Sequence, residues 1–171
     1  AGKTLGGIGM GRIVKELITR GAAFDMQPVA YYAYWDCAFA WKHKVIKAKS
    51  AEEVLAAADV ISLHMPLTEE TDKFINAERI AKMRDGAILI NTARGGLIDE
   101  QAVADACKSG KLYGYGGDVL VHEPIQPPHP FMEIDHVLLT PHVGSRTNES
   151  VERQAVRATQ NVVNFLKGDS D

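Results

Sequence analysis

Arg94, Glu123 and His142 are side chains of complementary chemistry, and each follows a short apolar run. Arg94 comes after "AILIN", Glu123 after "GYGGDV" and His142 after "HVLLT". A histidine exchanges protons near neutral pH, a neighbouring carboxylate favours its charged form, and an arginine binds both oxygens of a carboxylate at once. Together they suit a substrate that has a hydroxyl or a carbonyl on the carbon next to its carboxylate. The hydroxyl would lose a proton to the histidine, or the carbonyl would gain one from it. His142 would be the acid/base, Glu123 its partner and Arg94 the substrate clamp.

Each of these residues also has an ordinary structural interpretation. His142 follows a proline and could be a loop residue, Arg94 could cap a helix or pair with Asp99, and Glu123 could be solvated. The catalytic interpretation therefore depends on their convergence. Three further histidines, in the polar connection "HEPIQPPHPFMEIDH", are expected at the surface: His122, His129 and His136.

The stretch "TLGGIGMGRIVKEL" indicates a phosphate-binding turn between a strand and a helix. Gly9 and Gly11 fit the two positions at which glycine allows a positive φ and a close approach of a pyrophosphate to the helix start. The third position of the fingerprint needs a small residue for helix–strand packing, and here it is Val14. An ordinary glycine-containing loop is the alternative, because a partial fingerprint alone is weak evidence.

The end of the second expected strand leaves the choice between NAD and NADP open. An acidic residue there would accept hydrogen bonds from the adenosine ribose, but the position is occupied by Tyr32. Asp36 lies too far along to replace it, and the basic run Lys42–Lys44 would supply positive charge only if that loop folds back. Because no arginine stands beside Tyr32, NAD is slightly favoured.

The elements that must position these residues follow a strand–helix alternation. Apolar runs predict strands over residues 4–8, 28–32, 59–64, 86–91, 112–119 and 136–140. Helical patterns lie between and after them, over residues 11–20, 50–58, 77–83, 99–110 and 148–167. Ser50 and Asp99 suit helix starts, and Gly110 and Gly168 suit helix ends. The pattern predicts a Rossmann-type α/β fold, a doubly wound parallel sheet, with residues 1–171 forming one domain.

In such a sheet ligands bind outside the carboxyl ends of the strands, and polar residues gather there in this sequence. They are His64, Pro66, Asn91, Thr92, Arg94, Asp118, Glu123 and His142. Beside a dinucleotide site, this set favours hydride transfer between a nicotinamide and a 2-hydroxy acid.

Composition and charge exclude other classes of function. The net charge of −3, without a polybasic tract, gives no reason to expect a nucleic-acid or membrane partner. No apolar run reaches the roughly 20 residues that a membrane span needs. Cys37 and Cys107 lack the spacing of a metal site, so no metal is expected, and a reducing cytoplasm is the expected location.

The segments "LGGIGMGRI", "ADVISLHMPLTEETDKFIN", "GAILINTARGGLIDEQAV" and "LLTPHVGSRT" together resemble the coenzyme-binding domain of the D-2-hydroxyacid dehydrogenase family. The resemblance implies that Arg94, Glu123 and His142 are the catalytic residues. It also implies a homodimer formed through this domain and a small 2-hydroxy or 2-keto acid as the substrate. Related formate dehydrogenases carry glutamine in place of Glu123, which favours the 2-hydroxy acid branch. The implied cofactor-binding residues are Gly9, Met10, Gly11, Arg12, Ile13, Tyr32, His64, Pro66, Thr92, Ala93, Asp118 and Gly144.

The sequence departs from the family pattern in several places. Val14 and Tyr32 replace a small residue and an aspartate, and "WDCAFAWKHKVIKAKS" is unlike the polar helix usual there. The substrate domain of the family is absent from these 171 residues, so the first hypothesis is that they are cut from a longer enzyme. The alternatives are a stand-alone dinucleotide-binding or redox-sensing module without turnover, and a damaged relative that has lost binding.

Overall fold

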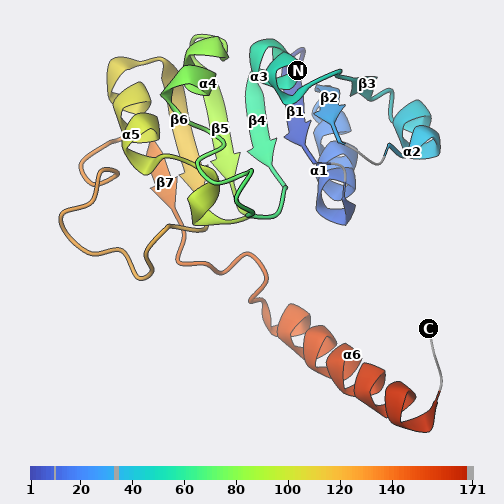
Figure 1. The fold of residues 1–171 in the computed structure, drawn as a ribbon. Helices are drawn as coiled ribbons and strands as arrows, with labels where there is room; N and C mark the ends of the chain where they lie inside the picture. Colours follow the sequence, from blue (N-terminus) through green and yellow to red (C-terminus); the bar gives the residue numbers. More distant parts are fainter. Residues whose placement is uncertain (10, 33–34, 169–171) are drawn as a thin grey trace. The chain divides into compact units, whose positions relative to one another are not determined.

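The computed structural model describes residues 1–9, 11–32 and 35–168. The chain divides into two compact units, Ala1–Thr140 and Pro141–Asp171, and each is described by itself. The first unit contains a sheet of parallel strands in the order β3-β2-β1-β4-β5-β6-β7 (Figure 1). This is the strand order of a Rossmann fold extended by one strand. The strands are β1 (Thr4–Ile8), β2 (Gln27–Tyr31), β3 (Ile46–Lys47), β4 (Val60–Leu63), β5 (Ala87–Asn91), β6 (Leu112–Gly117) and β7 (Val137–Leu139).

The helices of the first unit connect successive strands. They are α1 (Arg12–Ala22), α2 (Cys37–Lys42), α3 (Ala51–Ala57), α4 (Ala77–Lys82) and α5 (Glu100–Ser109), with a 3-10 turn η1 (Gly95–Leu97) after β5. The predicted α/β alternation is confirmed. The stretch that the sequence left irregular, residues 35–50, forms the short helix α2 and the two-residue strand β3 at the edge of the sheet.

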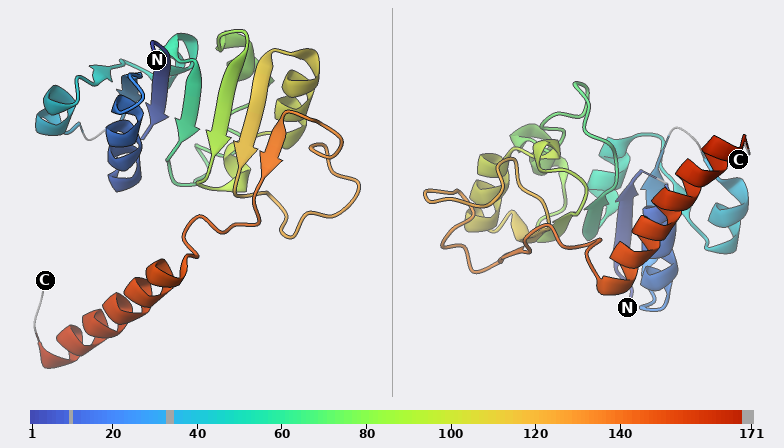
Figure 2. Two further views of the ribbon diagram at one scale, coloured as in Figure 1. Left: turned by 180° about the vertical axis from the view of Figure 1, so that it is seen from behind. Right: turned by 90° about the horizontal axis from the view of Figure 1, so that it is seen from below.

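Two consecutive glycines of β1 show how the layers are arranged. A Cβ atom on Gly6 would lie 2.7 Å from the side chain of Ala58, just after α3, whereas one on Gly7 would lie 3.0 Å from Val14 of α1. Successive strand residues face opposite sides of a sheet, so α1 and α3 cover opposite faces of β1 (Figure 2). Both helices approach the central strand closely because it has no side chains at these positions.

Side-chain caps fix the helix boundaries at the predicted places. The Ser50 hydroxyl accepts from the amide of Glu53 at 3.2 Å, and the Asp99 carboxylate accepts from the amide of Ala102 at 3.1 Å. Gly110 ends α5 in the left-handed conformation, with φ of 79°. The core between the layers is aliphatic and closely packed, and its most buried members include Val54, Leu55, Ile61, Leu63, Leu89, Leu97 and Ile98.

The second unit consists mainly of α6 (Asn148–Lys167), which has the predicted bounds. The Thr147 hydroxyl caps its start by accepting from the amide of Ser150, and Gly168 ends it with φ of 80°. Among the described residues, no helix has both the length and the apolar character needed to cross a membrane.

Candidate functional site

Gly9 and Gly11 stand between β1 and α1. Gly9 has φ of 109°, and a Cβ atom on it would lie 2.7 Å from the carbonyl oxygen of His64, so only glycine fits. Gly11 caps the start of α1, and a Cβ atom on it would meet nothing within 4 Å. Among the described residues no side chain caps α1, and uncapped amides at a helix start can bind an anion. Gly9 thus has the predicted positive φ, whereas the binding of a pyrophosphate by these two glycines stays a prediction. Met10 lies outside the described residues.

Val14 fits because the residue that it faces on β1 is Gly7, which has no side chain. Its side chain is fully buried, and its Cγ1 atom lies 3.0 Å from where the Cβ atom of Gly7 would be. The methyl groups of Val14 therefore occupy the space that a side chain at Gly7 would need. The helix therefore stays close to the strand despite the departure from the fingerprint.

A cleft of about 710 Å³ joins this turn to the ends of β4 and β5. Its volume is typical of a site for a ligand of cofactor size. The cleft lies at the point where the strand order reverses, between β1 and β4, which is where open α/β sheets bind ligands. Seven of the predicted cofactor residues line it: Gly11, Arg12, Ile13, His64, Pro66, Thr92 and Ala93. The other lining residues are Val14, Met65, Leu67 and Arg94.

His64 stands at the end of β4 as a half-buried side chain. Its ring Nε2 lies 2.8 Å from the hydroxyl of Ser62, and its amide donates to the carbonyl of Ile8 at 2.9 Å. Burial lowers the pKa of His64 to about 4, from an ordinary value of 6.5. The imidazole is therefore neutral at pH 7, so His64 does not attract an anion to the cleft by charge.

This pKa shift predicts a pH dependence of stability. The folded pKa lies below the unfolded value, so the unfolded chain binds the extra proton between about pH 6.5 and pH 4. The neutral imidazole contributes its full stability above about pH 6.5, and this contribution is lost as the pH falls toward 4. We expect the melting temperature to fall between pH 6.5 and pH 5, and His64→Gln to reduce that fall. His136→Gln, at an exposed position, is the control, and an equal effect of both variants would contradict the assignment.

The loop after β5 is held by a buried asparagine. The Asn91 side chain accepts from the amide of Ala93 at 3.1 Å and donates to the carbonyl of Arg94 at 2.9 Å. These two bonds hold the loop that carries Thr92, Ala93 and Arg94 at the cleft, and the Arg94 guanidinium is exposed there and donates to the Ala93 carbonyl. The sequence placed Asn91 at a strand end but gave no sign of its role in the loop.

The segment that follows β5 contacts the segment that follows β6 at Gly95. A Cβ atom on Gly95 would lie 2.1 Å from the carbonyl carbon of Leu120, so the loop of Arg94 packs on the backbone that leads to Glu123. The Glu123 carboxylate accepts from the amide of Leu120 at 2.9 Å. Asp118 is buried, and its amide donates to the Asn91 carbonyl while its carboxylate accepts from the hydroxyl of Thr140. The structure thus brings the segments of Arg94, Asp118 and Glu123 together.

A contact between a glutamate and a histidine, both largely buried, holds the connection after β6. The Glu100 carboxylate accepts from the amide of Val121 at 3.0 Å, and its other oxygen lies 3.4 Å from Nε2 of His129. The His129 side chain is 10% exposed, so the expectation of a surface histidine was wrong. Its Nδ1 accepts from the amide of Phe131 at 3.3 Å. The pair ties both sides of the loop that carries Glu123 to the start of α5.

The remaining predicted residues are Tyr32, His142 and Gly144. Tyr32 directly follows β2 and is half-buried. His142 and Gly144 belong to the second unit, and His142 has φ of 53°. The convergence of His142 with Arg94 and Glu123 stays a prediction. Within residues 1–9, 11–32 and 35–168, no group of three or more His, Cys, Asp or Glu side chains is arranged to hold a metal ion.

Comparisons with known proteins identify the family of the chain. Residues 1–144 match the family model described as D-isomer specific 2-hydroxyacid dehydrogenase, NAD binding domain. The chain is 38% identical to a glyoxylate reductase of Thermofilum pendens over 98% of its own length and 50% of the relative. It is 40% identical to a hydroxypyruvate reductase of Thermotoga maritima, covering 96% of this chain and 53% of the relative.

A solved structure gives the same fold. The D-lactate dehydrogenase from Aquifex aeolicus, complexed with NAD and lactic acid, superposes with a TM-score of 0.87 at 36% identity. The match covers 98% of this chain and 54% of that one. The chain thus spans about half the length of the relatives it matches. With the glycine turn, the parallel sheet and the cleft at its reversal point, these matches show that the chain belongs to the NAD-binding domain family of the D-isomer specific 2-hydroxyacid dehydrogenases.

Proposed function

We propose that this domain works in an oxidoreductase that transfers a hydride between a nicotinamide cofactor and a D-2-hydroxy acid. The observation that supports it best is the cleft at the reversal point, in which the glycine turn, His64 and the Arg94 loop share one space. The residues fit a dinucleotide, because Gly9 permits close approach, Gly11 leaves room, and α1 presents uncapped amides.

The roles of the side chains follow from their chemistry. NAD, when bound, supplies the acceptor for the hydride that leaves C2 of the hydroxy acid. His142 takes the proton of the C2 hydroxyl as the carbonyl forms, and it returns that proton in the reverse reaction. Glu123 stabilises the charged imidazole, and Arg94 binds the substrate carboxylate through its two-pronged guanidinium. A keto acid and the reduced cofactor are the products.

The test of this proposal starts with cofactor binding by the domain. Calorimetry should detect NADH binding, and Gly9→Ala should weaken it at least tenfold. The added methyl group collides with the His64 carbonyl and disfavours the positive φ, at a cost of about 1–3 kcal/mol. Gly110→Ala, at the end of α5, carries a comparable φ of 79° with open space around it, and it should leave NADH affinity unchanged. Equal binding by all three proteins would contradict the proposed turn.

Turnover tests the enzymatic part of the proposal. The full-length protein encoded by the gene should oxidise NADH in the presence of small 2-keto acids such as glyoxylate, hydroxypyruvate or pyruvate. Clear turnover would exclude a module that binds the dinucleotide without reacting. Binding of NADH without turnover of any acid in the panel would favour that alternative.

We also propose that the protein is a cytoplasmic homodimer formed through this domain, as the family resemblance implies. Light scattering after gel filtration checks the dimer, and a monomeric mass at micromolar concentration would contradict it.

A further inference from the structure

We propose that Lys47 and Trp35 bind the 2′-phosphorylated adenosine of NADP, so that the domain binds NADPH at least as tightly as NADH. This inference rests on the proposed dinucleotide function. In a Rossmann fold the adenosine ribose lies at the carboxyl end of β2, where a carboxylate selects NAD and a cation accommodates the 2′-phosphate of NADP. The residues around the end of β2 therefore determine the preference.

The carboxylate nearest in sequence to the end of β2 is already engaged elsewhere. One oxygen of Asp36 accepts from the amide of Phe39 at 3.0 Å and caps α2, while the other forms an ion pair with Lys15 of α1. The hydrogen bond from Lys15 holds the pKa of Asp36 below its usual value. Asp36 thus ties α2 to α1, and its charge is compensated. It does not supply the carboxylate that would hold a ribose diol or repel a phosphate.

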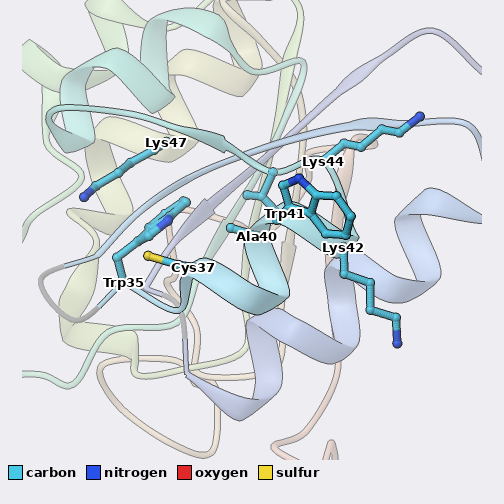
Figure 3. Close-up of a pocket in the computed structure, with 8 residues that line it drawn as sticks. Trp35, Cys37, Ala40, Trp41, Lys42, Lys44 and Lys47 are labelled. Carbon is cyan, nitrogen blue, oxygen red and sulfur yellow. The ribbon is translucent and has the colours of Figure 1, made fainter.

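A cation and an aromatic ring stand beside the end of β2 instead. In the sheet register Lys47 of β3 is the partner of Ala30, the penultimate residue of β2. The Lys47 ammonium lies 5.3 Å from the centroid of the Trp35 ring. Figure 3 shows Lys47 and Trp35 at one end of a cleft, together with Cys37. An aromatic ring there offers a flat surface for a purine, and the ammonium offers a charge for a phosphate.

The cleft as a whole is cationic. It has a volume of about 700 Å³ and is lined by Trp35, Cys37, Ala40, Trp41, Lys42, Lys44, Val45 and Lys47. No acidic residue is in the lining, and none of its lysines forms a salt bridge with the described part of the chain. A phosphate monoester carries about −1.5 to −2 charges at pH 7, so it is attracted to this surface more strongly than a ribose hydroxyl.

The two ends of the cleft are not equivalent. The Lys44 carbonyl accepts from the side chain of Gln27 at 2.9 Å, which places Lys44 at the amino end of β2. Trp41, Lys42 and Lys44 gather at the end of the cleft opposite Lys47 (Figure 3). A dinucleotide bound at the carboxyl ends of the strands therefore reaches Lys47 and not Lys44. This difference supplies a matched control within one pocket.

The experiment is a calorimetric titration of NADH and NADPH into the wild-type domain and three variants. NADPH should bind to the wild type at least as tightly as NADH. Lys47→Gln should weaken NADPH binding about tenfold or more and change NADH binding less than twofold, because only NADPH carries the 2′-phosphate. Lys44→Gln should change neither. Tyr32→Asp should restore a carboxylate at the end of β2 and reverse the preference in favour of NADH.

Each failure has a separate meaning. If neither nucleotide binds to the wild type, the proposed dinucleotide function is wrong. If NADH binds and NADPH binds more weakly than NADH, only the inference about Lys47 and Trp35 is overturned. The same holds if Lys47→Gln and Lys44→Gln weaken NADPH equally, since a general electrostatic effect of the lysines would then account for the result. Unchanged melting temperatures of the variants verify that these substitutions leave the fold intact.

Discussion

Arg94→Gln in the full-length protein is expected to lower kcat/KM for a 2-keto acid by about 10²–10³-fold, with the NADH dissociation constant unchanged within about twofold. Removing one partner of a charge pair in a closed site costs about 2–5 kcal/mol, which corresponds to this loss. Glutamine keeps hydrogen-bonding groups at the position but has neither the charge nor the two-pronged geometry of a guanidinium. The loss should therefore fall on the substrate and not on the cofactor.

The structure explains why this substitution should leave the loop in place. The Asn91 side chain holds the loop through the backbone of Ala93 and Arg94, so these two bonds remain when the bond from the Arg94 guanidinium to the Ala93 carbonyl is lost. Arg94→Lys should be intermediate, because it restores the charge without the fork. Arg12→Gln offers a contrast within the same cleft, since Arg12 begins α1 at the turn and should affect NADH binding. Steady-state kinetics and NADH titration measure both effects. Equal loss of NADH binding in Arg94→Gln would show that the clamp role is wrong.

His142→Ala should abolish measurable turnover across the pH range in which the protein is folded. General acid–base catalysis contributes about 10²–10⁴-fold, and no other described histidine is expected to replace it. His64 is neutral and lies against Ser62, and His129 is committed to Glu100. The measurement is kcat for keto-acid reduction at several pH values, with NADH binding as the check on folding. His136→Ala, an exposed histidine outside the cleft, is the control. Retained activity in His142→Ala would show that another group moves the proton.

The parts of the fold that local sequence determines were predictable. Strands buried on both faces appear as apolar runs, and Ser50, Asp99, Gly110 and Gly168 mark helix ends by their own chemistry. Parallel strands also bring their carboxyl ends to one edge of the sheet. For this reason the sequence alone predicts that Gly11, His64 and Ala93 lie near one another, and all three line the same cleft.

The contacts that the sequence did not predict are formed by pairs of residues from separate elements. Glu100 and His129 each have an ordinary exposed interpretation, and only the fold brings them together as a buried pair. The residues between Trp35 and Ser50 have no clear period, because α2 and β3 are short and lie at the sheet edge. The register between β2 and β3, which places Lys47 beside Ala30, could not be predicted from composition.

The packing of Val14 against Gly7 changes how the third position of the glycine fingerprint is interpreted. The requirement at the third position is a limit on the combined size of two residues, one on the strand and one on the helix, and either can be the small one. A search pattern that inspects the helix position alone rejects such a chain, whereas a pattern that scores both positions accepts it. In a protein engineered from this one, enlarging Gly7 would require shrinking Val14 in the same step.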